Sequence, residues 1–143
     1  MSALRLPYYE LSTEAVNGLL ATKKALEDSP LGKPLVELIY LRISQINGCA
    51  FCLEQHSKSL REDGVSQVKL DSLAGWKVSG HFDARERAAL AWAESLTDVA
   101  RSNAADADYE PLKAHFSDKE ISDLTLAIAL MNALNRTAVG MRL

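Results

Sequence analysis

Residues 44–52 read Ser-Gln-Ile-Asn-Gly-Cys-Ala-Phe-Cys, and they separate two stretches with a helical spacing of hydrophobic residues. The Asn-Gly pair at 47–48 is a strong helix stop, because glycine and asparagine tolerate the left-handed conformation that ends helices. A new helix is therefore predicted to begin near Cys49. Cys49 and Cys52 then share one face of that helix, and His56 lies one turn further along it.

The pattern on both sides of this stretch is helical almost throughout. Apolar residues recur at spacings of three and four, and strand-like alternation is nowhere sustained. Asp83 and Ser117 each precede a glutamate by three positions, which is a helix-start signature. We expect helices at 12–26, 34–46, 49–64, 66–76, 83–97 and 117–141. The predicted fold class is all-α, a compact bundle of six to seven helices in one domain spanning 1–143.

Composition excludes several classes of protein. The chain is 48% hydrophobic, enough for a buried core, and its formal net charge of -3 argues against a nucleic-acid binder. The N-terminus lacks the apolar segment of a signal peptide. The longest apolar run, 126–131, is much shorter than a membrane span. We expect a cytoplasmic protein that binds neither nucleic acid nor membrane.

The only two cysteines of the chain, Cys49 and Cys52, are the candidate reactive groups. A disulfide between them closes too short a loop to stabilise the fold much, so the pair suits a cycle between dithiol and disulfide. Only about 3% of an ordinary thiol is ionised at pH 7, and a helix N-terminus and the imidazole of His56 both favour the thiolate. Two alternatives stay open: a buried apolar pair, and part of a zinc site.

Glu37 is the candidate partner for His56, because a carboxylate beside an imidazole orients and polarises it. On one unbroken helix Glu37 would lie about 18 Å from Cys49. It therefore approaches the site only if the chain bends at Asn47-Gly48. The sequence leaves this contact open, and a favourable interaction with the helix dipole is the alternative role for Glu37.

The extended motif resembles a known family. Residues 44–52 followed by His56, with Glu37 twelve positions before Cys49, look like the alkylhydroperoxidase D-like (AhpD-like) group of the carboxymuconolactone decarboxylase superfamily. The helix at 83–97 and the segment 132–136 also resemble that group, so the likeness spans most of the chain. One departure is Phe51, where the best-known members carry a second histidine before the later cysteine.

The resemblance implies an all-helical homo-oligomer, commonly a trimer or hexamer, that reduces hydroperoxides. It implies that Cys52 attacks the peroxide, that Cys49 resolves the sulfenic acid, and that Glu37 and His56 form a proton relay. No bound cofactor is implied, and an external dithiol or lipoyl-carrying reductant such as dihydrolipoamide recycles the disulfide. Members without the cysteines decarboxylate a lactone acid, and possession of both cysteines argues against that chemistry here.

Two other hypotheses use the same residues differently. The cysteine pair would also suit a reductase for a disulfide in a partner protein or lipoyl group. A non-enzymatic module that binds metal or mediates assembly is the third hypothesis. Polar residues on the apolar last helix, Asn132, Asn135 and Arg136, are predicted to make structural hydrogen bonds to a neighbouring helix or subunit.

Overall fold

The computed structural model describes residues 3–143, and all the regular elements within them are helices. The long helices are α2 (Thr13–Glu27), α3 (Lys33–Asn47), α4 (Ala50–Glu62), α6 (Ala84–Thr97) and α9 (Asp118–Met141). The short helices are α1 (Tyr8–Leu11), α5 (Gln67–Asp71), α7 (Val99–Ser102), α8 (Asp106–Tyr109), and the 3-10 helices η1 (Leu73–Val78) and η2 (Glu110–Ala114). The all-α prediction is confirmed.

The number of helices differs from the expectation of six to seven. Residues 3–143 form nine α-helices and two 3-10 helices. The difference lies in the short helices, because four to six residues are too few to display a helical hydrophobic period. The expected helix starts at Asp83 and Ser117 are confirmed, since their side chains accept the backbone N–H of Glu86 and Glu120 over 2.8 and 3.2 Å.

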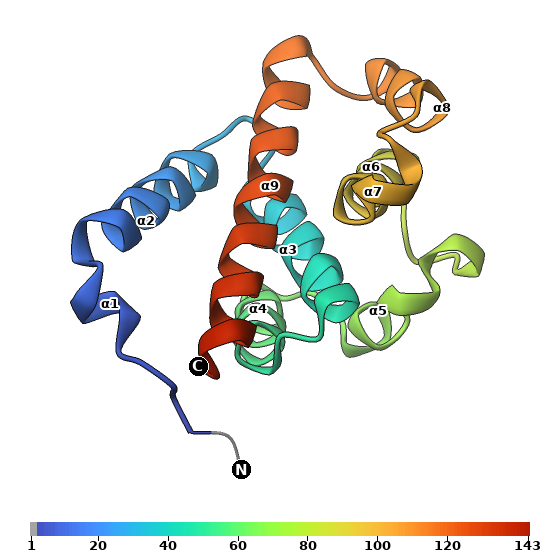
Figure 1. The fold of residues 1–143 in the computed structure, drawn as a ribbon. Helices are drawn as coiled ribbons and strands as arrows, with labels where there is room; N and C mark the ends of the chain where they lie inside the picture. Colours follow the sequence, from blue (N-terminus) through green and yellow to red (C-terminus); the bar gives the residue numbers. More distant parts are fainter. Residues whose placement is uncertain (1–2) are drawn as a thin grey trace.

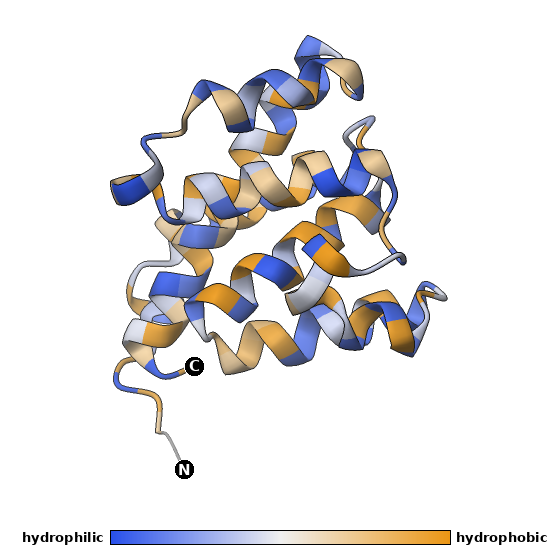
Figure 2. Cartoon of the chain, turned by 90° about the vertical axis from the view of Figure 1, so that its right-hand side faces the viewer, coloured by the Kyte–Doolittle hydropathy of each residue, from blue (hydrophilic) through white to orange (hydrophobic). Residues whose placement is uncertain are grey.

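The centre of the bundle is α3, which packs against α4, α9 and α6. Its residues Ile39, Tyr40 and Ile43 are fully buried, which is typical of a helix surrounded by others. Figure 1 shows α9 running the length of the molecule, with α2 on one side of it and α6 to α8 on the other. Hydrophobic and hydrophilic residues alternate along the helices (Figure 2), as expected where each helix buries one side.

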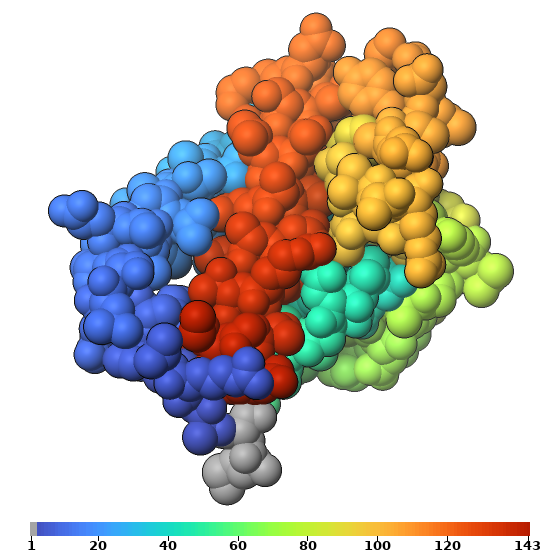
Figure 3. All heavy atoms as spheres, in the orientation of Figure 1, coloured from blue at the N-terminus to red at the C-terminus, as the bar shows by residue number. Residues whose placement is uncertain are grey.

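The last helix, α9, forms one wall of this core. By length and composition alone it could cross a membrane, but here it packs against α3, α6, α2 and α4. Its residues Leu124, Ile128 and Met131 are buried, while Leu126 is 54% exposed. Figure 3 shows one side of α9 at the surface, between the N-terminal helices and α6 to α8. The helix is therefore deeply buried on one side only.

The two ends of the described chain meet beside α9. The backbone N–H of Arg5 donates to the carbonyl of Met141 over 2.8 Å, and the Arg5 guanidinium donates to the carbonyl of Gly140 over 3.2 Å. These bonds hold the segment before α1 at the C-terminal end of α9 (Figure 1). As a result, α1 and α2 face α4 and α9 across a space that contains the candidate site.

Candidate active site

The predicted turn at Asn47-Gly48 is confirmed, and it places Cys49 at the start of α4. Gly48 adopts a left-handed conformation, with φ of 66°, and the carbonyl of Ser44 accepts the N–H groups of both Gly48 and Cys49. Cys49 is the N-cap of α4, and its sulfur accepts the backbone N–H of Cys52 over 3.4 Å. Because this N–H is one of the unpaired donors of the first turn, negative charge on the Cys49 sulfur is favoured.

The two cysteines are joined as a disulfide, with their Cα atoms 5.3 Å apart. They differ in their surroundings. Cys49 is 1% exposed and packs against Ala138 and Val139 of α9. Cys52 is 6% exposed and lines a cavity to which Cys49 does not contribute. Of the two sulfurs, the one in Cys52 is therefore the one that a ligand in this cavity would meet.

His56 and Glu37 touch, which settles the contact that the sequence left open. His56 Nδ1 lies 2.8 Å from Glu37 Oε2, and both side chains are buried. Because α3 and α4 pack side by side after the turn, Glu37 reaches the helix that carries the cysteines. The hydrogen bond fixes the orientation of the imidazole and leaves Nε2 as the ring nitrogen for a proton at the cavity.

Tyr40 packs next to His56 and Glu37. Its ring centroid is 5.3 Å from that of His56, and its buried hydroxyl has no hydrogen-bond partner within the described chain. Burial, with the nearby carboxylates of Glu37 and Glu27, raises the pKa of Tyr40 well above its ordinary value. The tyrosine is therefore a neutral packing residue at neutral pH and not a second base.

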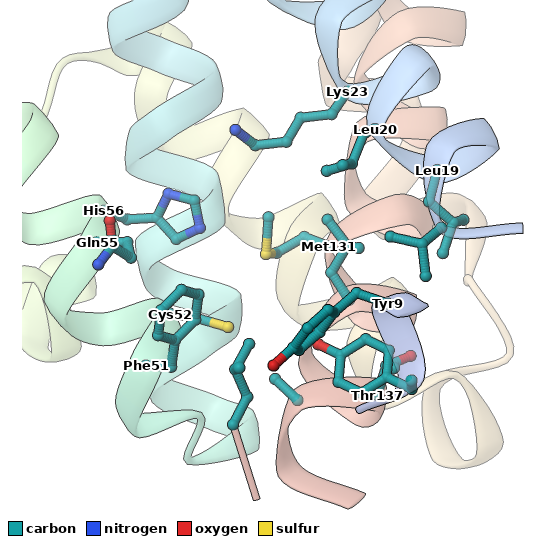
Figure 4. Close-up of a pocket in the computed structure, with 15 residues that line it drawn as sticks. Tyr9, Leu19, Leu20, Lys23, Phe51, Cys52, Gln55, His56, Met131 and Thr137 are labelled. Carbon is teal, nitrogen blue, oxygen red and sulfur yellow. The ribbon is translucent and has the colours of Figure 1, made fainter. Parts of the chain in front are cut away.

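The cavity beside Cys52 has a volume of about 380 Å³. Residues from four helices line it, and α1 and α2 contribute a wall that the motif around the cysteines does not indicate. Figure 4 shows Cys52, His56 and Phe51 on one side of the cavity and residues of α1, α2 and α9 on the other. The lining side chains include Tyr9, Leu19, Leu20, Lys23, Phe51, Cys52, Gln55, His56, Met131 and Thr137.

Asparagines connect the turn to α9. Asn135 is fully buried; its amide donates to the Ser44 hydroxyl over 3.1 Å, and its oxygen accepts the amide of Asn47 over 3.1 Å. Asn47 also donates to Asn132, which in turn accepts a bond from Arg136. The predicted structural hydrogen bonds to a neighbouring helix are thus confirmed for Asn132 and Asn135, whereas Arg136 donates to Asn132 within the same helix. They hold the turn that sets the position of Cys49.

The structure offers no cluster for the metal-binding alternative within residues 3–143. In that part of the chain, no three histidine, cysteine, aspartate or glutamate side chains are grouped so that they could hold a metal ion. The residues of that alternative, Cys49, Cys52 and His56, are instead engaged in the disulfide and in the pair with Glu37.

Comparison with known proteins agrees with the geometry. Residues 11–95 match the carboxymuconolactone decarboxylase family. The uncharacterised protein YdfG of Bacillus subtilis is 30% identical over 96% of this chain and 93% of its own length. The crystal structure of ATU0492 from Agrobacterium tumefaciens, a protein of unknown function, superposes with a TM-score of 0.94 at 40% identity, covering 98% of this chain and 96% of that one.

A further solved structure carries a more specific description. A peroxidase-related protein from Ralstonia eutropha, described as an alkylhydroperoxidase AhpD core, superposes with a TM-score of 0.80 at 27% identity. The match covers 94% of this chain and 73% of that protein. Fold, motif and sequence similarity thus agree, and this chain belongs to the carboxymuconolactone decarboxylase family, within its AhpD-like group.

Proposed function

We propose that this protein is a thiol peroxidase that reduces hydroperoxides through a dithiol–disulfide cycle at Cys49 and Cys52. One observation carries the proposal: Cys52, disulfide-bonded to Cys49, lines a cavity together with His56, which is hydrogen-bonded to the buried Glu37. A nucleophile, a proton-transfer group and an orienting carboxylate are the parts that such a reaction needs.

In the first step, the Cys52 thiolate attacks one peroxide oxygen. The S–O bond forms as the O–O bond breaks, and the departing alkoxide takes a proton and leaves as an alcohol. Cys52 is then a sulfenic acid. His56, oriented by Glu37, stands at the cavity wall where it can accept the thiol proton and return it to the leaving oxygen.

In the second step, the Cys49 thiolate attacks the Cys52 sulfur, the disulfide forms, and the sulfenic oxygen leaves as water. The N–H of Cys52 points at the Cys49 sulfur, which favours the thiolate that this attack requires. An external dithiol, such as a dihydrolipoyl group, then reduces the disulfide by two thiol exchanges and is itself oxidised to a disulfide. The bonded cysteines in the structure correspond to the oxidised end of the cycle.

The roles of the two cysteines follow from their accessibility. Cys52 lines the cavity, whereas Cys49 is 1% exposed and does not line it. A peroxide in the cavity meets Cys52 first, and Cys49 meets only the Cys52 sulfur. Lactone decarboxylation, the chemistry of family members without the cysteines, uses neither residue.

Peroxide consumption by the reduced protein tests the proposal. With a hydroperoxide and dihydrolipoamide we expect turnover, and without the dithiol we expect one equivalent of peroxide to yield one Cys49–Cys52 disulfide, seen by mass spectrometry. Cys52→Ser should consume no peroxide, while Cys49→Ser should stop after one equivalent with a sulfenic acid at Cys52. Thiols that stay reduced under peroxide but exchange with lipoyl or protein disulfides would instead show a disulfide reductase.

We also propose that the chain forms a cytoplasmic homo-oligomer, a trimer or hexamer. Large apolar side chains remain exposed near the N-terminus, among them Leu6 at 51% and Leu11 at 67%. Surfaces of this kind are commonly covered by a second subunit. Light scattering on the purified protein gives the oligomer mass, and a monomer at micromolar concentration would contradict this part of the proposal.

A further inference from the structure

The cavity beside Cys52 combines an apolar wall with one strongly basic side chain. Leu19, Met131 and Leu134 contribute apolar surface from α2 and α9. Among the described residues that line the cavity, Lys23 is the only lysine or arginine. The volume of about 380 Å³ lies within the range of small-molecule pockets. A ligand that matches both features has an aliphatic body and an anionic group.

Lys23 is oriented to receive such a group. Its side chain extends from α2 toward the side of the cavity that carries His56 (Figure 4). The ammonium donates to Glu27 Oε1 over 3.1 Å, and because an ammonium has three donors, two stay available for an anion in the cavity. The apolar wall lowers the local dielectric, which strengthens the attraction. Glu27 competes for the same charge, so its removal should strengthen anion binding.

The mouth of the cavity is apolar as well. Tyr9, Leu20 and Phe51 line the cavity and yet are 42%, 49% and 41% exposed. Large apolar side chains that stay exposed together mark surfaces that bind an apolar ligand. If an alkyl chain is longer than the cavity, its end can extend over these three side chains and stay partly shielded from water.

We propose that this cavity binds a fatty acid, with the carboxylate at Lys23 and the alkyl chain along α2 and α9. Taken with the proposed peroxidase reaction, on which this step rests, the substrate class is fatty-acid hydroperoxides. The binding site itself does not depend on that reaction, so the two can be tested separately.

Binding is measured by displacement of a dansyl-labelled fatty acid from the oxidised wild-type protein. We expect dodecanoate to bind about tenfold more tightly than dodecanol, the difference that one charge-assisted hydrogen bond supplies. Lys23→Met should remove this preference, and Glu27→Gln should increase it. Lys24→Met is the matched control, because Lys24 is the exposed neighbour on α2 and lies outside the cavity lining, and it should behave as wild type.

Equal affinities for dodecanoate and dodecanol in the wild-type protein would overturn the inference. So would a carboxylate preference that survives in Lys23→Met, or one that Lys24→Met loses equally. Circular dichroism of each variant separates loss of binding from loss of fold.

The kinetic test compares a fatty-acid hydroperoxide with its methyl ester, which keeps the chain and the peroxide and loses only the charge. We expect kcat/KM to favour the acid about tenfold in wild type and to be equal for both in Lys23→Met. Peroxide turnover without this preference would overturn the fatty-acid site and leave the peroxidase intact. If the protein binds dodecanoate but its thiols do not react with peroxide, the fatty-acid site stands and the peroxidase proposal is wrong.

Discussion

His56 is fixed in the site by a single carboxylate. Its Nδ1 lies 2.8 Å from Glu37 Oε2 in a buried region, where a hydrogen bond to a charged group is stronger than in water. With Nδ1 engaged, Nε2 is the nitrogen that would exchange a proton at the cavity in the proposed reaction. His56 and the carboxylate that orients it therefore come from different helices, α4 and α3.

Glu37→Gln should slow peroxide reduction while leaving the fold intact. Glutamine keeps the size of the side chain but removes the charge that stabilises a protonated His56, so we expect the rate of Cys52 oxidation to fall about tenfold to hundredfold. Stopped-flow measurement of peroxide consumption gives this rate. Glu54→Gln, an exposed substitution on α4, is the control and should leave it unchanged. An unaltered rate in Glu37→Gln would remove Glu37 from the proposed relay.

At this scale the sequence located the groups but not all of their contacts. The positions of Cys49, Cys52 and His56 along one helix follow from their spacing alone, and the structure confirms them. The contact of Glu37 with His56 depends on the angle at which α3 and α4 pack, which no local spacing encodes. Glu27, which lies near Tyr40, and Lys23, which lines the cavity, both come from α2. No sequence motif marked either residue.

The element that brings these groups together is the turn between α3 and α4. Gly48 ends α3 with φ of 66°, and an alanine Cβ at this position would meet no atom within 4 Å. The requirement for glycine is therefore one of backbone conformation and not of space.

Gly48→Ala should lower the free energy of unfolding by about 1 kcal/mol, because a side chain disfavours the left-handed region. Gly18→Ala is the matched opposite: Gly18 lies within α2, its added Cβ also meets nothing within 4 Å, and alanine should stabilise the helix by roughly 0.5–1 kcal/mol. Urea denaturation of the oxidised proteins measures both. If the two substitutions change stability in the same direction, the conformational argument for Gly48 is wrong.

The same turn is held from the other side by α9. Asn135→Ala removes the hydrogen bonds of Asn135 to Ser44 and Asn47 from a fully buried position and leaves a small cavity. We expect the free energy of unfolding to fall by about 2 kcal/mol, seen as a lower urea midpoint with an unchanged slope. Arg136→Ala, on the exposed side of α9, should cost much less. Equal losses would show that the buried asparagine holds the turn no more firmly than a surface residue.

Helix starts were the most predictable part of the fold. Each of the long helices begins and ends within two residues of the expected bounds, because glycine, proline and capping residues mark those positions locally. Short helices such as α7 and α8 were not expected, since one turn offers no period to detect and packing against α6 decides their conformation. Local signals therefore determine where α4 and α9 begin and end. The conformation of residues 98–116 depends instead on tertiary contacts.

At the scale of the molecule, the cavity joins parts of the chain that lie far apart in the sequence. Its walls come from α1 and α2 near one end and from α9 at the other, and the bonds from Arg5 to Gly140 and Met141 hold these ends together. No motif predicted this arrangement. Much of the cavity wall is therefore supplied by residues outside the stretch that carries the two cysteines.

A second long-range connection joins α3, η1 and α6 on the opposite side of the core. Glu94 on α6 accepts hydrogen bonds from Trp76 Nε1 over 2.8 Å and from Arg42 Nε over 3.0 Å, and Lys77 lies 3.4 Å away. Burial by itself would raise the pKa of Glu94. The hydrogen bonds from Trp76 and Arg42, with the charges of Arg42 and Lys77, outweigh it and hold this pKa below its ordinary value of 4.5.

This lowered pKa predicts how acid destabilises the protein. A carboxylate whose pKa is lower in the folded state contributes stability that is present above its unfolded pKa and is lost as the pH falls through the folded value. The free energy of unfolding of the wild type should therefore decrease as the pH is lowered from about 5 toward 3. Glu94→Gln should be less stable at pH 7 and lose less on acidification, whereas Glu54→Gln, exposed on α4, should follow the wild-type curve. Urea denaturation across this pH range gives the curves, and parallel slopes for wild type and Glu94→Gln would mean that the packing of α6 against α3 and η1 does not depend on this charge.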